Sequence, residues 1–365
     1  MLNVQAVSVM YHGRKVGTLS VGSGTNCQFE YDKSWLADGF SISPLKLPLK
    51  AGLFTADYSP FNGNFGVFED SLPGGYGEYL LRKMLKKLGV DFRQFSPVQW
   101  LSIIGSSGMG ALCYVPETKL PANTDALSLD EIQQMALDVL SEKTDDNAEA
   151  LYFKSGNSGG VRPKCLFTDA DGQWLVKFRH TYDPKNMGEI EYQYNKVARQ
   201  CGIDVPDFKL IGGKYFATRR FDIESGVRLH VATASALLNE PITPPKMDYH
   251  SLLQLTGYLT QSPEAVEQQF RRMAFNICAQ NMDDHARNFS FICREGRWTL
   301  APAYDLTNDA TLGEHASTVN YSGLPSDEDM ITVGINIRIS RLRCQQIIDE
   351  VRNGTQELRR FFSKK

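Results

Sequence analysis

The chain has 365 residues, of which 42% are hydrophobic and 22% charged, and its formal net charge at pH 7 is −3. This composition is ordinary for a globular protein, and the length allows two domains or one two-lobed enzyme with an extension. A net charge this close to zero gives no electrostatic argument for direct binding of nucleic acid or of an anionic membrane.

The cysteines and the amino terminus indicate the compartment. Seven cysteines are scattered along the chain without a CxxC pair, which is typical of reduced thiols in a cytoplasm rather than of disulfides or a zinc site. No apolar stretch of signal-peptide length follows a basic start, and no run approaches the length of a membrane span. We therefore expect a cytoplasmic protein without a membrane partner.

Residues 1–118 predict a β-containing amino-terminal subdomain. Apolar and polar residues alternate over residues 4–20 on both sides of His12-Gly13, which predicts a β-hairpin. Residues 79–88 carry apolar side chains at helical spacing, and Gly89 is the expected helix end.

Residues 119–225 predict a connector and a small β-rich lobe. The connector is polar and acidic, with one amphipathic helix at residues 129–140. Asp169-Ala170-Asp171-Gly172 predicts a tight turn between two strands. The strands of the lobe are expected at residues 164–167, 173–178, 208–211 and 215–218, with a helix at 188–200.

Residues 226–365 predict a mainly helical lobe, and a β-rich lobe followed by a helical lobe is the order found in protein kinases. Helices are expected at residues 231–238, 249–259, 265–280 and 340–360. Residues 289–292 and 298–300 predict a hairpin within this lobe.

The helical lobe carries the strongest chemical pattern. Asp283 and Asn288 are five positions apart, and Asp305 follows the predicted hairpin. Protein kinases place a catalytic base and two magnesium ligands in this way, because one carboxylate must engage a hydroxyl while an amide and a second carboxylate hold the metal. Asp284 lacks the five-residue offset. A metal-hydrolase site with His285 as ligand, or a network of capping Asx residues, are the alternatives.

The β-rich lobe carries the residues suited to a nucleotide. A glycine-rich segment that precedes the first strand can bring backbone amides close to phosphates. Lys177 lies at the end of an apolar strand and suits the lysine that contacts the α- and β-phosphates. Glu191 and Glu189 both qualify as its partner, and Glu191 is favoured. The alternatives are a flexible hinge and a snorkelling lysine. The segment consists of Ser155, Gly156, Asn157, Ser158, Gly159 and Gly160.

Eight motifs in order along almost the whole chain resemble the HipA family of bacterial toxin kinases. They are Phe29-Glu30-Tyr31, Asp70-Ser71-Leu72-Pro73-Gly74-Gly75-Tyr76-Gly77, Ser158-Gly159-Gly160-Val161-Arg162-Pro163-Lys164, Leu175-Val176-Lys177-Phe178, Arg220-Phe221-Asp222, Arg228-Leu229-His230, residues 281–288 and Pro302-Ala303-Tyr304-Asp305-Leu306. Gly74 departs from the pattern, since many relatives carry an acidic residue there.

The resemblance implies an α+β fold of protein-kinase type, with a β-rich N-lobe, a helical C-lobe and an additional amino-terminal subdomain. It implies phosphorylation of serine or threonine on a protein, with ATP and Mg²⁺ as cofactors. Asp283 would be the catalytic base and Lys177 the phosphate lysine. Asn288 and Asp305 would hold the metal, and His285 lies in the same nucleotide-facing loop.

The resemblance also implies an adenine-binding hinge and a regulatory site. Arg220, Phe221 and Asp222 fall at the hinge position. Ser158 is the favoured site of autophosphorylation, ahead of Ser155. Implied partners are a small DNA-binding HipB-like antitoxin and a protein substrate, for which an aminoacyl-tRNA synthetase is one target known in the family.

Two other functions are compatible with these residues. One is a nucleotide-binding pseudokinase that acts as corepressor with a DNA-binding antitoxin. The presence of Lys177, Asp283, Asn288 and Asp305 argues against it, because a pseudokinase has usually lost at least one of these groups. The other is a kinase that acts on a small molecule.

Overall fold

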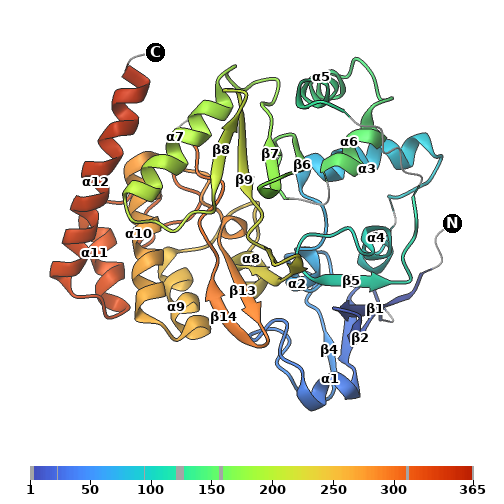
Figure 1. Ribbon diagram of the computed structural model, residues 1–365. Helices are drawn as coiled ribbons and strands as arrows, with labels where there is room; N and C mark the ends of the chain where they lie inside the picture. Colours follow the sequence, from blue (N-terminus) through green and yellow to red (C-terminus); the bar gives the residue numbers. More distant parts are fainter. Residues whose placement is uncertain are drawn as a thin grey trace. The chain divides into compact units, whose positions relative to one another are not determined.

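A computed structural model describes residues 4–22, 24–93, 95–120, 127–155, 159–309 and 312–363 (Figure 1). The chain divides into two compact units. The first consists of Met1–Gly188 and Tyr215–Val231, and the second of Glu189–Lys214 and Ala232–Lys365. The division expected from sequence, into residues 1–118, 119–225 and 226–365, remains a prediction. The units place residues 189–214, expected in the β-rich lobe, with the helical part of the chain.

The amino-terminal part of the first unit is built on a five-stranded antiparallel sheet in the order β4-β3-β2-β1-β5. The expected hairpin is present, with Tyr11 paired to Arg14. His12 and Gly13 have φ of 45° and 78°, as a two-residue turn requires when its twist matches the strands. The strands are β1 (Ala6–Tyr11), β2 (Arg14–Val21), β3 (Cys27–Tyr31), β4 (Leu53–Thr55) and β5 (Leu112–Val115).

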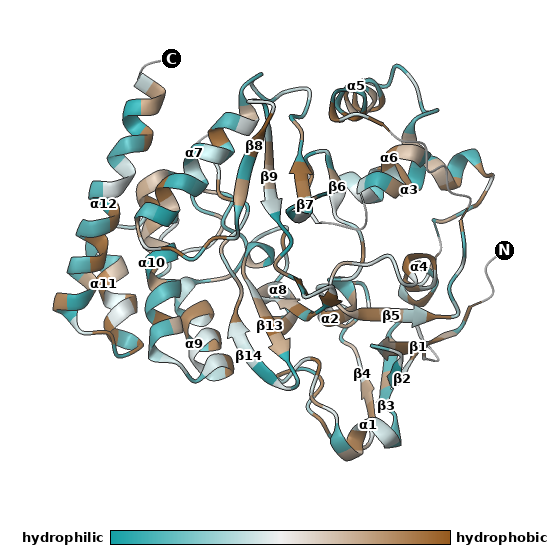
Figure 2. Ribbon diagram, in the orientation of Figure 1, coloured by the Kyte–Doolittle hydropathy of each residue, from teal (hydrophilic) through white to brown (hydrophobic). Residues whose placement is uncertain are grey.

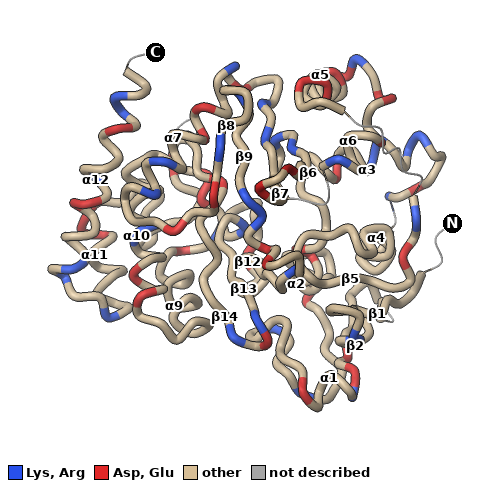
Figure 3. The backbone as a smooth tube through the Cα atoms, viewed as in Figure 1, with Lys and Arg blue, Asp and Glu red and all other residues tan. Residues whose placement is uncertain are grey.

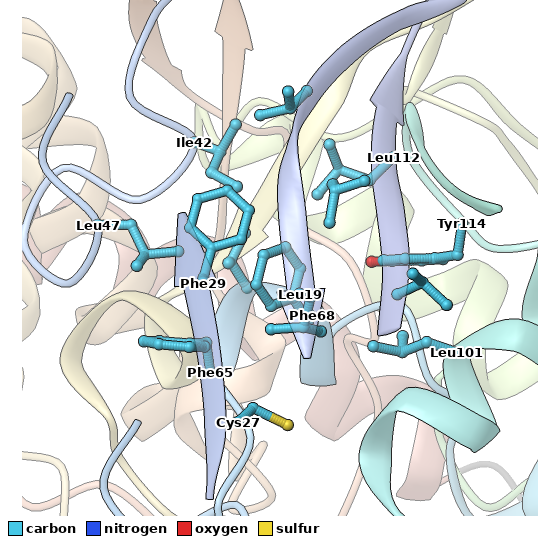
Figure 4. Close-up of a cluster of buried hydrophobic side chains, with 14 of the residues drawn as sticks. Leu19, Cys27, Phe29, Ile42, Leu47, Phe65, Phe68, Leu101, Leu112 and Tyr114 are labelled. Atoms are coloured by element: carbon cyan, nitrogen blue, oxygen red, sulfur yellow. The ribbon is translucent and has the colours of Figure 1, made fainter. Parts of the chain in front are cut away.

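One face of this sheet is covered by apolar side chains from helices and connecting segments. The helices of this part are α1 (Lys33–Asp38), α2 (Gly66–Glu69), α3 (Gly75–Lys87) and α4 (Pro97–Ile104). Figure 4 shows Phe29 and Leu19 from the sheet meeting Phe68 and Leu101 from the helices in one buried cluster. These residues all belong to the amino-terminal part, which therefore has a hydrophobic core of its own. Burial of each large side chain in it contributes about 1.5–3 kcal/mol to stability.

The β-rich part of the first unit contains the expected hairpin of β6 (Lys164–Asp169) and β7 (Gly172–Lys177). Asp169 accepts the Asp171 amide at 2.9 Å within the turn, and β7 pairs on its other side with β9 (Tyr215–Arg219). The remaining elements are α5 (Leu129–Leu140), α6 (Ala148–Ser155), β10 (Ile223–Glu224) and β11 (Val227–Arg228).

The second unit is mainly helical, and apolar residues at helical spacing explain its packing. In α12, Cys344, Ile347, Ile348 and Val351 are buried, and the helix packs against α10 and α11; Figure 2 shows hydrophilic and hydrophobic residues alternating along it. The elements are α7 (Met187–Gln200, which begins in the first unit), β8 (Phe208–Ile211), α8 (Ala234–Leu238), α9 (Tyr249–Thr260), α10 (Pro263–Ala279), η1 (Ala286–Asn288), β13 (Ser290–Arg294), β14 (Arg297–Leu300), α11 (Asp327–Asn336) and α12 (Arg341–Ser363).

Some local structure differs from the expectation. Residues 231–233, expected to begin a helix, belong to strand β12 (His230–Thr233), and α8 begins only at Ala234. Thr233 is the N-cap, since its side chain accepts the Ala236 amide at 3.1 Å. Helices α4 and α11 were not predicted, although each has a capping box that begins at a serine, Ser96 and Ser326.

The distribution of charged and apolar residues is that expected from the near-neutral, ordinary composition. Acidic and basic residues are interspersed along the chain (Figure 3). Within the described residues, no helix combines the length and the apolar character needed to cross a bilayer.

A buried histidine in the first unit gives a testable pH dependence. His230 is 1% exposed, and its Nε2 donates to the Ile42 carbonyl oxygen at 2.8 Å. Burial lowers the pKa of His230 to about 4. The neutral ring therefore stabilises the fold fully above pH 6.5, and the contribution is lost as the pH falls from 6.5 to about 4.

We predict that His230→Gln makes the protein less sensitive to acid. One pKa unit corresponds to about 1.4 kcal/mol. As the pH falls from 6.5 to about 4, the free energy of unfolding of the wild type should therefore decrease by about 3 kcal/mol because of this residue. Glutamine keeps an amide donor for Ile42 but does not titrate. Urea unfolding of both proteins at pH 7 and pH 4.5 measures the difference, and an equal loss of stability in both would contradict the prediction.

Candidate active site

Two adjacent aspartates in the loop after α10 have opposite environments. The side chain of Asp283 is 47% exposed, whereas Asp284 is 1% exposed. Asp284 Oδ2 accepts the Tyr249 hydroxyl at 2.7 Å and lies 3.1 Å from His315 Nδ1. Its Oδ1 accepts the Ser317 amide at 3.1 Å. Asp284 is therefore held inside the unit, and only Asp283 has a carboxylate that another molecule can reach.

The hydrogen bonds of Asp284 continue into helices α9 and α10. Asn276 Nδ2 donates to the Tyr249 hydroxyl oxygen at 2.8 Å, and Asn281 Nδ2 donates to Asn276 Oδ1 at 2.9 Å. Burial, and then the Asp284 charge, raise the pKa of Tyr249 well above its usual value, so the phenol stays a proton donor. The loop that begins at Asn281 is thus fixed to two helices.

Asn288 folds back on the loop that carries Asp283. Its Nδ2 donates to the Asp283 carbonyl oxygen at 2.6 Å, and its amide donates to the His285 carbonyl oxygen at 2.9 Å. Since the side-chain nitrogen is used in this way, the amide oxygen is the atom left to accept or to coordinate. The five-residue offset brings Asn288 to Asp283 through this contact.

Asp305 is held between two anchoring residues. The Tyr304 hydroxyl donates to the Arg287 carbonyl oxygen at 2.7 Å, and the Thr307 amide donates to Asn281 Oδ1 at 3.4 Å. Asp305 itself has φ of 56°, a left-handed conformation that costs energy in a residue other than glycine. The anchors on both sides hold this conformation and bring Asp305 to the loop of residues 281–288.

His285 lies beside Asp283 rather than in a cluster of histidines. Its Nε2 is 3.8 Å from Asp283 Oδ1, and its side chain is 18% exposed. Nδ1 is buried and has no hydrogen-bond partner among the described residues. His315, the histidine nearest in sequence, contacts Asp284 instead. The geometry thus gives no support to the metal-hydrolase alternative at His285.

A buried arginine lies behind the loop, where sequence reasoning did not anticipate a charge. Arg272 is 3% exposed, and its Nε has no hydrogen-bond partner within the described part of the chain. It lines a cavity of about 10 Å³ together with Asn288, Asp284 and Tyr304, which is room for about one water molecule. Burial lowers the pKa of Arg272 to about 10, opposed by the Asp204 charge. The side chain therefore remains charged at neutral pH.

In the first unit, two buried lysines stand opposite each other. Lys164 of β6 pairs with Lys177 of β7 in the antiparallel register, and they are 6% and 8% exposed. Lys164 Nζ donates to the Gly159 carbonyl oxygen. Lys177 and its expected partner Glu191 belong to different units, so that pairing stays a prediction.

The glycine-rich segment is described only in part. Gly156, Asn157 and Ser158 lie outside the described residues. Ser155 ends helix α6, is 1% exposed, and donates from Oγ to the Tyr152 carbonyl oxygen at 3.0 Å. Beyond the glycines, Arg162 pairs with Asp183, with Nε 3.0 Å from Oδ2.

At the expected adenine hinge, the side chains of Arg220 and Asp222 are used in hydrogen bonds within the protein. Asp222 is 5% exposed and receives two hydrogen bonds from Arg220, at 2.9 and 2.6 Å, and one from the Gly110 amide at 3.0 Å. Burial acts to raise the pKa of Asp222, but these hydrogen bonds and the Arg220 charge hold it below its usual value. Contact with adenine would therefore rest on Phe221 and the main chain, and this role stays a prediction.

Comparison with known proteins gives the family. A family model described as "HipA-like C-terminal domain" matches residues 156–358, and one described as "HipA N-terminal domain" matches residues 7–115. A search of curated protein sequences gives no match.

Solved structures give the fold. The Shewanella oneidensis MR-1 structure of HipA, HipB and operator DNA matches with a TM-score of 0.72 and 16% identity, and the match covers 96% of this chain and 89% of that one. The Helicobacter pylori proinflammatory kinase CtkA matches with a TM-score of 0.34 and 12% identity over 53% of this chain and 90% of that one. The match to HipA confirms the predicted α+β fold of protein-kinase type with an additional amino-terminal subdomain.

The match to the C-terminal domain model spans more than half of the chain, and the match to the N-terminal domain model falls on the subdomain built around β1–β5. The chain therefore belongs to the HipA family.

Proposed function

We propose that this chain is an ATP- and Mg²⁺-dependent serine/threonine protein kinase of the HipA toxin type, which phosphorylates a protein target and itself. The observation that carries the proposal is the contrast between the two adjacent aspartates. Asp284 is buried and fully hydrogen-bonded, and this fixes the loop from which the half-exposed Asp283 reaches solvent. A kinase needs one accessible carboxylate held rigidly in this way.

The donor atoms near Asp283 suit Mg²⁺. Asn288 has its amide oxygen left to coordinate, and Asp305 supplies a carboxylate on a constrained main chain. Magnesium prefers a few such oxygen ligands and takes the rest from phosphates and water. When bound with ATP, it would stabilise the charge on the transferred phosphoryl group.

Chain residues would then perform the remaining steps. Asp283 would accept a hydrogen bond from the substrate hydroxyl and orient its oxygen toward the γ-phosphorus. As the new O–P bond forms and the bond to ADP breaks, the hydroxyl proton would pass to the Asp283 carboxylate. Lys177, together with the amides of the glycine-rich segment, would hold the phosphates.

Autophosphorylation and target choice belong to the same proposal. Ser158 is the favoured site of autophosphorylation, because Ser155 is buried at the end of α6. A phosphate there would add about −1.5 to −2 charges beside those of ATP and reduce nucleotide binding. The target would be serine or threonine on a protein, and an aminoacyl-tRNA synthetase is the class that we propose to test first.

We also propose a HipB-like DNA-binding antitoxin as partner, with no direct contact of this chain with nucleic acid and a cytoplasmic location. The solved S. oneidensis structure contains HipA with HipB and operator DNA. Co-expression with a small HipB-like helix-turn-helix protein from the same organism should give a complex that elutes together in gel filtration. Separate elution at micromolar concentration would contradict the pairing.

Asp283→Asn should lower phosphoryl transfer by about 10²–10⁴-fold, since the amide cannot accept the proton. ATP affinity and thermal stability should stay near the wild type, because the side chain is half exposed. Transfer from labelled ATP to cell-extract proteins measures activity, and mass spectrometry should find a phosphate on Ser158 only in the active protein. ATP binding without transfer in the wild type would instead favour the pseudokinase corepressor.

Asp284→Asn is the matched comparison, with the same chemical change one residue away. It leaves a buried amide among groups arranged for a carboxylate, so the free energy of unfolding should fall by about 1–3 kcal/mol. Denaturant unfolding of both variants measures this. A stable Asp284→Asn without activity, beside an active Asp283→Asn, would exchange the roles of the two residues.

Asp305→Ala and Asn288→Ala should weaken ATP binding only when Mg²⁺ is present, because each removes an oxygen ligand of a hard cation. Calorimetry with ATP, in Mg²⁺ and in EDTA, measures the effect in each variant. Wild-type affinity that is equal with and without Mg²⁺ would contradict the proposed metal roles.

A further inference from the structure

The described part of the glycine-rich segment lies against the amino terminus of α3, within the first unit. The Tyr76 amide donates to the Gly160 carbonyl oxygen at 3.1 Å. Tyr76 is the second residue of α3, where an amide has no partner inside the helix. The N-cap residue is Gly74, which has no side chain that could accept from the first amides of the helix. The Gly160 carbonyl oxygen therefore accepts the hydrogen bond that an N-cap side chain would otherwise accept.

Glycine at position 74 makes this contact possible. A Cβ atom built on Gly74 would lie 2.7 Å from the Gly159 Cα and 2.8 Å from its carbonyl carbon, and would overlap the Gly160 nitrogen. These are backbone atoms that cannot rotate away. At Gly75 the equivalent atom would approach only the Val161 Cγ1, at 2.9 Å, the end of an exposed side chain. The two main chains touch at Gly74 because neither carries a side chain there.

The contact also decides which way the peptide groups of the loop face. In a trans peptide the carbonyl and the following amide point in opposite directions. The Gly160 carbonyl faces the Tyr76 amide, and the Gly159 carbonyl accepts from Lys164 Nζ. The Val161 amide, which follows the Gly160 carbonyl in the chain, therefore points away from the Tyr76 amide. Carbonyl oxygens repel phosphate and amides attract it, so turning the Gly160 carbonyl toward α3 favours an anion beside the Val161 amide.

We propose that the amino terminus of α3, at Gly74-Gly75-Tyr76, is a seat that fixes the Gly159-Gly160 end of the glycine-rich segment and so sets the affinity for ATP. This inference rests on the proposed function, because it needs the loop to bind nucleotide. The seat belongs to the segment matched by the HipA N-terminal domain model, and the loop to the segment matched by the C-terminal one. A partner that displaces α3 would then change ATP affinity without touching the nucleotide.

A graded set of glycine substitutions tests the seat. Gly74→Ala should weaken ATP binding roughly tenfold or more, about 1.4 kcal/mol, and speed hydrogen exchange at the Tyr76 amide. Gly75→Ala should have a smaller effect, because Val161 can change rotamer, and the added Val161→Ala should remove it. Gly24→Ala is the matched control: no heavy atom lies within 4 Å of its added Cβ, and it should behave as wild type.

Two readouts separate the possible failures. Hydrogen exchange without nucleotide reports the seat, and calorimetry with ATP and Mg²⁺ reports the affinity. Wild-type ATP affinity in Gly74→Ala, tighter binding, or unchanged exchange at Tyr76 would each overturn the seat. Absence of ATP binding in the wild type would instead overturn the proposed function and the affinity role together. If Gly74→Ala does not fold, Gly75→Ala and its Val161→Ala rescue decide the question.

Discussion

A buried carboxylate needs enough hydrogen bonds to offset the loss of water, and the candidate site is organised around this requirement at Asp284. Its partners come from α9 and from the segment that holds His315 and Ser317. These groups are far apart in sequence, so satisfying one carboxylate draws three segments together. The neighbouring Asp283 is thereby left at the surface on a rigid loop.

The same polar network fixes the second half of the site. Asn281 connects α10 to the segment after Asp305 through the Thr307 amide. Tyr304, the residue before Asp305, donates its hydroxyl to the Arg287 carbonyl oxygen. Such anchors can maintain the left-handed backbone of Asp305, which would relax if either side were free. The buried charge of Arg272 adds a positive field behind a loop that carries several carboxylates and carbonyls.

The first unit positions its loop by a different physical means. Around Gly74 and Gly160 the main chains pack directly on each other, and the Tyr76 amide of α3 donates a hydrogen bond to the Gly160 carbonyl oxygen. At the edges of this contact, Arg162 pairs with Asp183 and Lys164 donates to the Gly159 carbonyl oxygen. Glycine at position 74 is therefore a packing requirement of this chain as well as a helix start.

The sequence by itself determined the elements whose pattern is local, together with the family. Alternation around His12-Gly13 and helical spacing at residues 129–140 are properties of neighbouring residues, and both elements are present. The offset between Asp283 and Asn288 is local too, and it was enough to select these residues as candidates. Helices α4 and α11 were missed although their capping boxes are visible in the sequence.

Only the tertiary structure decided which polar residues support the site. Nothing near Tyr249, Asn276 or His315 in the sequence relates them to Asp284, because a hydrogen bond depends on the distance between atoms and not on spacing along the chain. The contact of Gly74 with Gly160 has the same cause. The environments of Asp283 and Asp284 differ for this reason as well: two chemically identical neighbours acquire opposite exposure from the partners that folding brings to one of them.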